Sequence, residues 1–202
     1  MAEGVSNARI IAGGGLLIAA AMGIGRFAYT PMLPPMQTAL GWSVAQAGDV
    51  ASANYLGYVL GALLSSWLSQ RARPWPWLLT GMLATVLTIA AGAVVTGFHA
   101  WLALRFASGV ASALCMVFGA GIFMDWFARR GRNDLGTAHL GGVGGGIVLS
   151  VLVIEAVAGP AAGIASLWGA LGIAAALMTV AALVLVWPAL RIAPVRHDAG
   201  PR

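Results

Sequence analysis

The sequence predicts an all-α integral membrane protein with six transmembrane helices, and three observations favour this fold class. Hydrophobic residues make up 60% of the 202 residues and charged residues only 8%, whereas soluble domains carry about 25% charged residues. Six segments are long and apolar enough to cross a bilayer, which takes about 20 residues. All eleven basic residues are arginines, and most of them lie in alternate connections between these segments. Because Cys115 is the single cysteine, a disulfide scaffold is excluded.

The first three segments lie between polar or proline-containing breaks. Segment 10–31 follows Arg9 and is longer than the apolar part of a signal peptide, so we expect it to remain in the protein. Segment 48–70 follows a polar connection that contains prolines. The segment ends just before Arg71. Segment 75–97 then begins after a short basic turn.

The last three segments complete the predicted transmembrane domain. Segment 100–124 follows a two-residue connection, and 135–158 follows the arginine-rich stretch "MDWFARRGR". Segment 163–187 precedes a polar, proline-containing tail. The predicted domains are a cytoplasmic N-terminus at 1–9, a six-helix transmembrane domain at 10–187, and a cytoplasmic tail at 188–202.

The distribution of arginine predicts the orientation in the cell (plasma, or inner) membrane. Arginine-rich connections stay on the cytoplasmic side, and the connections expected outside, 32–47, 98–99 and 159–162, contain no arginine. Both termini are therefore expected in the cytoplasm, and the positive net charge needs no nucleic-acid partner. The arginines that define the cytoplasmic side are Arg9, Arg71, Arg73, Arg129, Arg130, Arg132, Arg191, Arg196 and Arg202.

Four charged residues lie within the expected membrane depth, and two interpretations of them remain open. Arg26 and Arg105 fall in the outer part of their segments, and Asp49 and Glu155 lie at or just above that level. In one interpretation the acids neutralise the arginines, since charges inside membranes tend to pair. In the other, an arginine binds an anionic solute, or an acid takes up a proton that is coupled to transport.

Uncharged polar residues near this group are further candidates. Asn54 is expected to make an interhelical or cavity-facing hydrogen bond, and Tyr55 follows it directly. Tyr29 is interpreted as an anchor at the membrane interface. His139 is interpreted as a hydrogen-bonded packing residue, with proton transfer as the alternative. The sequence indicates no cofactor and no metal site.

Glycines recur four residues apart, a spacing that lets helices approach closely in lipid. The pairs are Gly57 with Gly61, Gly141 with Gly145, and Gly142 with Gly146. We expect them to mark tight helix–helix contacts.

Three stretches resemble a known transporter family. They are "GIGRFAYTPMLPPM" at 23–36, "GWSVAQAGDVASANYLGYVLGALL" at 41–64 and "LRFASGVASA" at 104–113. The first two resemble the first helices of major facilitator superfamily transporters of the YbfB/YjiJ type, and the third resembles the fourth-helix motif of the superfamily.

The resemblance implies two three-helix repeats that form the amino-terminal half of a transporter, with a solute path between halves. It implies that Arg105 acts in cavity electrostatics or proton coupling, and that Arg26 lies on a cavity-lining helix. It also implies that a cytoplasmic cluster of Asp125, Arg129 and Arg130 takes part of a gate's role, because the connection after the second segment lacks the superfamily's acid.

The functional expectation is a secondary transporter of a small solute, with proton coupling, or the first half of one. The superfamily has twelve helices, whereas six are expected here. Three explanations remain open: a truncated product, a half that pairs with itself or with another half, or a protein that does not transport. A structural or partner-binding membrane protein is the alternative. An intramembrane serine protease with Ser108 and His139 is a less favoured alternative, because these residues are expected near opposite membrane faces.

Overall fold

The computed structural model describes residues 5–159 and 162–190, and this part of the chain is a bundle of long helices. The all-α prediction is confirmed for these residues. The elements are α1 (Asn7–Ile18), the π-helix η1 (Ala19–Phe27), α2 (Tyr29–Leu40), α3 (Val44–Ser69), α4 (Pro74–Ala91), α5 (Phe98–Ala128), the 3₁₀ helices η2 (Asn133–Leu135) and η3 (Ala138–Gly141), α6 (Gly142–Val157) and α7 (Ile164–Leu190).

Five stretches of the described chain are both long and apolar enough to cross a membrane, so the chain is a multi-pass membrane protein. The helix α3 has 26 residues, or about 39 Å at the rise of an α-helix. Its length would suffice, but Gln46, Asp49 and Asn54 make it less apolar. The five stretches are Asn7–Leu40, Pro74–Ala91, Phe98–Ala128, Asn133–Val157 and Ile164–Trp187.

The connection expected at 32–47 is largely helical, which corrects the sequence interpretation. The prolines there suggested a break, but α2 continues to Leu40 and contains Pro34 and Pro35. The helix ends at Gly41, whose φ of 65° is a conformation that glycine adopts readily. Two residues later Ser43 caps α3, where its side chain and that of Gln46 form a capping box.

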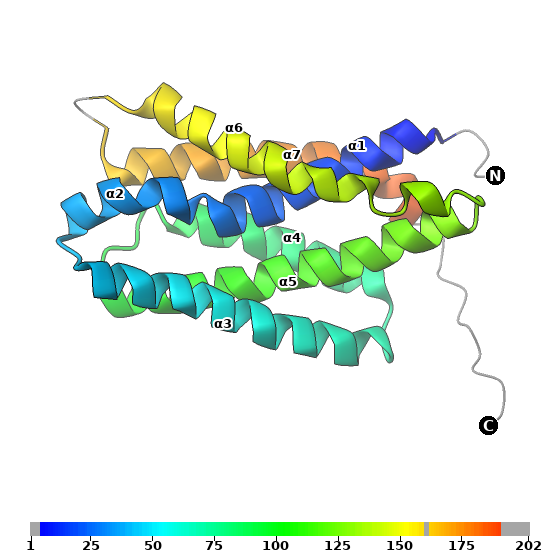
Figure 1. The fold of residues 1–202 in the computed structure, drawn as a ribbon, viewed down its shortest axis with the longest axis horizontal. Helices are drawn as coiled ribbons and strands as arrows, with labels where there is room; N and C mark the ends of the chain where they lie inside the picture. Colours follow the sequence, from blue (N-terminus) through cyan, green and yellow to red (C-terminus); the bar gives the residue numbers. More distant parts are fainter. Residues whose placement is uncertain (1–4, 160–161, 191–202) are drawn as a thin grey trace.

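The helices pack in two groups that meet along the middle of the bundle (Figure 1). In one group α5 packs against both α3 and α4. In the other, α1 and η1 pack against both α6 and α7. Contacts of η1 with α5 and of α4 with α7 join the groups.

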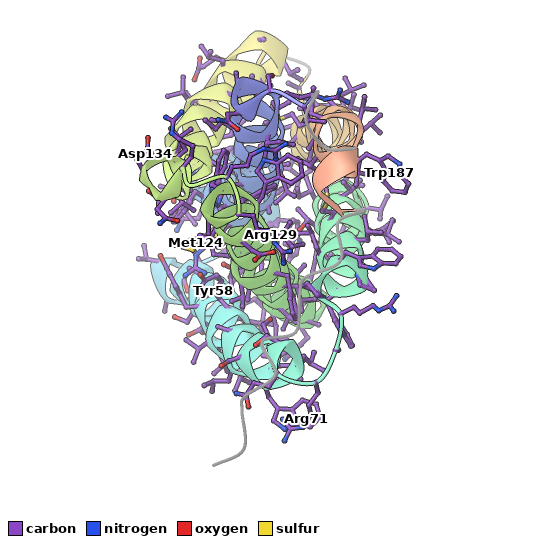
Figure 2. All side chains as sticks on the ribbon, turned by 90° about the vertical axis from the view of Figure 1, so that its right-hand side faces the viewer. Tyr58, Arg71, Met124, Arg129, Asp134 and Trp187 are labelled. Carbon is purple, nitrogen blue, oxygen red and sulfur yellow. The ribbon has the colours of Figure 1, made fainter. Side chains whose placement is uncertain are left out.

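The connections lie at two opposite ends of the bundle. The start of α1, the turn from α3 to α4, the connection from α5 to α6 and the end of α7 share one end, which Figure 2 shows face-on. We call it the arginine-rich end. The arginines of the described chain that belong to it are Arg9, Arg71, Arg73, Arg129, Arg130 and Arg132, while Arg191, Arg196 and Arg202 lie outside the described residues.

Glycines bring α3 and α5 into close contact. A Cβ atom added at Gly57 would overlap the carbonyl oxygen of Phe106, and one at Gly61 would lie 2.8 Å from the Cα of Val110. From the other side, a Cβ at Gly109 would overlap the carbonyl oxygen of Asn54. The expectation that this spacing marks tight packing is therefore confirmed for α3.

A second close contact joins α6 to the first helix. Added Cβ atoms at Gly142 and Gly146 would overlap the carbonyl oxygens of Gly15 and Ala19. Nothing lies within 4 Å of such an atom at Gly141 or Gly145. Of the two glycine pairs predicted in α6 and the residue before it, the pair Gly142 and Gly146 faces a neighbouring helix, and the pair Gly141 and Gly145 does not.

Candidate functional site

Arg105 on α5 is held by backbone carbonyls of η1. Its Nη1 donates to the carbonyl oxygen of Gly25 and its Nη2 to that of Arg26, both at 2.9 Å. The guanidinium thus joins α5 to the end of η1. Ser108, one turn further along α5, also donates to the Gly25 carbonyl at 2.9 Å.

Two further contacts fix Arg105 in a buried position with 4% exposure. The ring of Tyr29 lies against its guanidinium, with the ring centroid 4.9 Å from Cζ. The Tyr29 hydroxyl donates to the carbonyl of Ala47 at 3.0 Å, which ties α2 to α3. The side chain of Asn54 donates to the carbonyl of Arg105 at 3.0 Å, as an interhelical hydrogen bond between α3 and α5.

Arg26 lies among aromatic rings rather than acids. Its Cζ is 4.0 Å from the ring centroid of Tyr58, 4.7 Å from that of Tyr55 and 5.7 Å from that of Phe27. We call these three rings the Arg26 cage. Such contacts attract a cation through the ring quadrupole. The Nε and Nη1 atoms of Arg26 are buried and have no hydrogen-bond acceptor among the described residues.

The acids do not neutralise these arginines, which corrects the pairing interpretation. Asp49 and Glu155 are exposed, on α3 and α6 respectively. In the described ranges 5–159 and 162–190, no ion pair joins either acid to Arg26 or Arg105. The four predicted residues that the fold brings together are Arg26, Arg105, Asn54 and Tyr55.

The predicted cytoplasmic cluster lies at the arginine-rich end, far from this site. Asp125 pairs with Arg129 at 2.8 Å over one helical turn, and Arg130 lies with its Cζ 3.8 Å from the ring of Trp126. In the following turn Arg132 pairs with Asp134 at 2.8 Å, and this carboxylate raises the pKa of Arg132. Figure 2 shows Arg129 and Asp134 on this end.

Three further residues contribute to the site beyond those predicted from the sequence. Tyr29 is buried against Arg105 rather than anchored at an interface, Tyr58 contacts Arg26, and Ser108 supports Gly25. Each lies three residues from a named candidate on the same helical stretch, a spacing that places side chains on neighbouring faces. This spacing is the feature of the sequence that indicates these three residues as neighbours of the predicted ones.

The geometry gives the protease hypothesis no support. Ser108 is 4% exposed, and its hydroxyl is engaged with Gly25. His139 is buried, with its ring centroid 4.8 Å from that of Phe123. Phe123 is about 22 Å along α5 from Ser108 at the α-helical rise, so the two side chains cannot exchange a proton.

Comparison with known proteins identifies the family. The model of the family described as "Uncharacterised MFS-type transporter YbfB" matches residues 18–201. This chain belongs to that family. No curated protein shows significant similarity to the chain. All the residues of the site described above lie within the matched range.

Membership of the MFS-type family agrees with the long apolar helices of the described chain. The resemblance noted from the sequence is confirmed, and the chain is a multi-pass membrane protein of a transporter family. The family match covers η1 and all later described helices, so it includes the glycine contact between α3 and α5 and the arginines of the bundle interior.

Proposed function

We propose that this protein is a secondary transporter of the major facilitator type, or its amino-terminal half, which moves a small solute across the membrane. The observation that carries the proposal is the pair formed by Arg26 and Arg105, which lies between η1, α3 and α5 without an acidic partner in the described part of the chain. Charged side chains inside membrane bundles usually mark solute or ion pathways, and π-helical turns are frequent at functional sites.

Two three-helix repeats are proposed, the first from α1 to α4 and the second from α5 to α7. The packing supports this division, because each helix contact has a counterpart when the two repeats are exchanged. The helix α3 packs on α5, and its counterpart α6 packs on the first helix. The helix α4 packs on α5, and its counterpart α7 packs on α1. The glycine pairs support it too, since Gly57 and Gly61 face α5 as Gly142 and Gly146 face the first helix.

We also propose that α3 is the sixth span and that both termini lie in the cytoplasm. The length of α3 and its close packing along α5 support a transmembrane position. The concentration of arginines at one end of the bundle supports the orientation, because arginine-rich connections remain cytoplasmic.

Glu155 is the acid best placed to couple solute movement to protons. It continues an exposed apolar stripe on α6 that includes Val148, Val151 and Leu152. Charged side chains on the apolar surface of a membrane bundle are rare and usually mark a solute or ion pathway.

The proposed partner is a second six-helix half or a second copy of this chain. Exposed apolar residues on α3 support this, among them Leu56, Val59 and Leu63. In Figure 2, Tyr58 and Met124 lie on the side of α3 and α6, whereas Trp187 lies on the opposite side. The mass of the purified protein in detergent, compared with the 20.6 kDa of one chain, tests whether it pairs.

Flux into proteoliposomes tests the transport proposal. The wild-type protein should accumulate a solute from a broad panel when a pH gradient is imposed, and Glu155→Gln should reduce the dependence on the gradient. Asp134→Asn, in η2 at the arginine-rich end, is the matched control and should retain the dependence. Absence of flux for every solute, with the protein folded and inserted, would favour a structural or partner-binding role instead.

A further inference from the structure

The two interior arginines have no ion-pair partner in the described part of the chain. Among the described residues, the acids that form ion pairs are Asp125 and Asp134 at the arginine-rich end. Asp125 lies about 30 Å from Arg105 along α5 at the α-helical rise. A charge at that distance does not neutralise a guanidinium inside the bundle.

The two arginines differ in exposure and in the donors that they keep. Arg105 is almost fully buried and directs both terminal nitrogens to carbonyls of η1, which leaves its Nε without an acceptor among the described residues. Arg26 is partly exposed, and its Nε and Nη1 are buried atoms without an acceptor among these residues. Arg105 is therefore a fixed positive charge behind the site, and Arg26 is the group with two unpaired donors for a ligand.

The Arg26 cage determines how a ligand can approach. Tyr58 and Tyr55 lie close to the guanidinium carbon, at 4.0 and 4.7 Å from their ring centroids, so they cover part of its planar faces. The N–H groups at its edge are the donors that match the two oxygens of a carboxylate. Tyr55 is 55% exposed, so the cage is open beside this ring.

We propose, resting on the transport function above, that the solute is an organic carboxylate anion that binds Arg26. The carboxylate oxygens accept from the edge of the Arg26 guanidinium, and the apolar part of the solute lies against the Tyr55 ring. Arg105 attracts the anion through space without touching it. Inorganic phosphate has no apolar part to lie against the Tyr55 ring, so we expect it to bind more weakly than a carboxylate that has one.

Binding to the full-length protein in lipid nanodiscs tests the inference. The probes are acetate, hexanoate, benzoate and succinate, with benzamide as the neutral analogue of benzoate and inorganic phosphate as the competing anion. Isothermal titration calorimetry should show at least one carboxylate binding, with benzoate at least tenfold tighter than benzamide. Failure of all four carboxylates to bind, equal binding of benzamide, or tighter binding of phosphate would overturn the inference.

Variants locate the site. Arg26→Gln should weaken carboxylate binding at least tenfold, and Arg26→Lys should weaken it less, because it keeps the charge. Arg71→Gln removes a charge at the arginine-rich end and should leave binding unchanged. If Arg26→Gln does not fold, the lysine variant and Tyr55→Ala provide the comparison. Unchanged binding in the folded Arg26 variants would contradict the assignment.

Two further measurements separate this inference from the transport proposal and from a lipid site. Flux of a neutral or cationic solute, without carboxylate binding, would overturn the carboxylate inference and leave transport intact. Carboxylate binding without flux of any bound compound would overturn transport alone. A tenfold loss of carboxylate affinity in nanodiscs of anionic lipid would assign the site to a lipid headgroup, against this inference.

Discussion

At the scale of single residues, two arginines donate to main-chain carbonyls of helices other than their own. Arg105 donates to the carbonyls of Gly25 and Arg26 in η1. Arg9 donates to the carbonyl of Val184 at 2.9 Å, and the residue four positions later in α7 is a proline without an N–H. The Arg9 guanidinium therefore supplies the donor that this proline lacks.

Arg105→Gln should therefore destabilise the protein, whatever its effect on transport. The change removes two charge-assisted hydrogen bonds to buried carbonyls, which should lower the unfolding free energy by about 2–4 kcal/mol. Thermal unfolding in detergent, followed by circular dichroism, measures the effect. Arg71→Gln, an exposed control, should change stability by less than about 0.5 kcal/mol. Equal stabilities for the two variants would contradict the structural role of Arg105.

Tyr29→Phe tests the connection between α2 and α3. The variant keeps the ring against Arg105 but removes the hydrogen bond to Ala47. We expect a loss of about 1 kcal/mol, measured by unfolding in mixed micelles. Tyr55→Phe is the matched control, because this ring is largely exposed. If Tyr29 were only an interfacial anchor, the two phenylalanine variants would behave alike.

The candidate site was only partly predictable from the sequence. Arg26, Arg105 and Asn54 stood out because polar side chains in apolar segments are rare. Their partners did not, since the acceptors for Arg105 are backbone carbonyls, which carry no residue-type signal. The acids were misleading because Asp49 and Glu155 lie at a suitable depth along their helices. Depth does not specify which face of a helix a residue occupies.

At the scale of elements, the hydrophobic segments predicted the helices but not their irregularities. The stretch from α1 to α2 reads as one apolar segment and then a proline-rich break, whereas the structure contains a nine-residue π-helix and a further α-helix. A π-helix depends on which carbonyls find donors in other helices, so local composition does not specify it. The glycine spacing was more informative, because close contact requires small residues wherever the partner comes from.

Two alanine substitutions on α6 separate packing from helix propensity. Gly146→Ala places a Cβ against the carbonyl of Ala19, whereas Gly144→Ala meets nothing within 4 Å. The first should destabilise by about 1–3 kcal/mol through overpacking, and the second should be neutral or stabilise by up to about 1 kcal/mol. Unfolding free energies of the two variants measure the difference. A stable Gly146→Ala protein would show that this contact is looser than described.

At the scale of the whole molecule, the distribution of arginines predicted which connections share an end of the bundle. The described helices place these connections together, so the pattern of charge and the path of the chain agree. The packing partners of each helix were beyond the sequence itself, because the glycine spacing marks a close contact but does not identify the helix that makes it.

Labelling with a membrane-impermeant maleimide tests the orientation. Cys115 is buried and should not react in the folded protein. In intact cells, Thr38→Cys should be labelled, since it is exposed at the end opposite the arginines. Asn133→Cys, exposed in the connection from α5 to α6, should react only after permeabilisation. The reverse labelling pattern would place the termini outside.

The acceptors of Arg105 have an evolutionary consequence. They are the main-chain carbonyls of Gly25 and Arg26, which every residue type supplies. Replacement of the side chain at position 26 therefore removes no acceptor of Arg105. The two arginines are constrained differently: position 26 can vary with the solute that is bound, whereas position 105 needs a side chain that reaches two carbonyls at once.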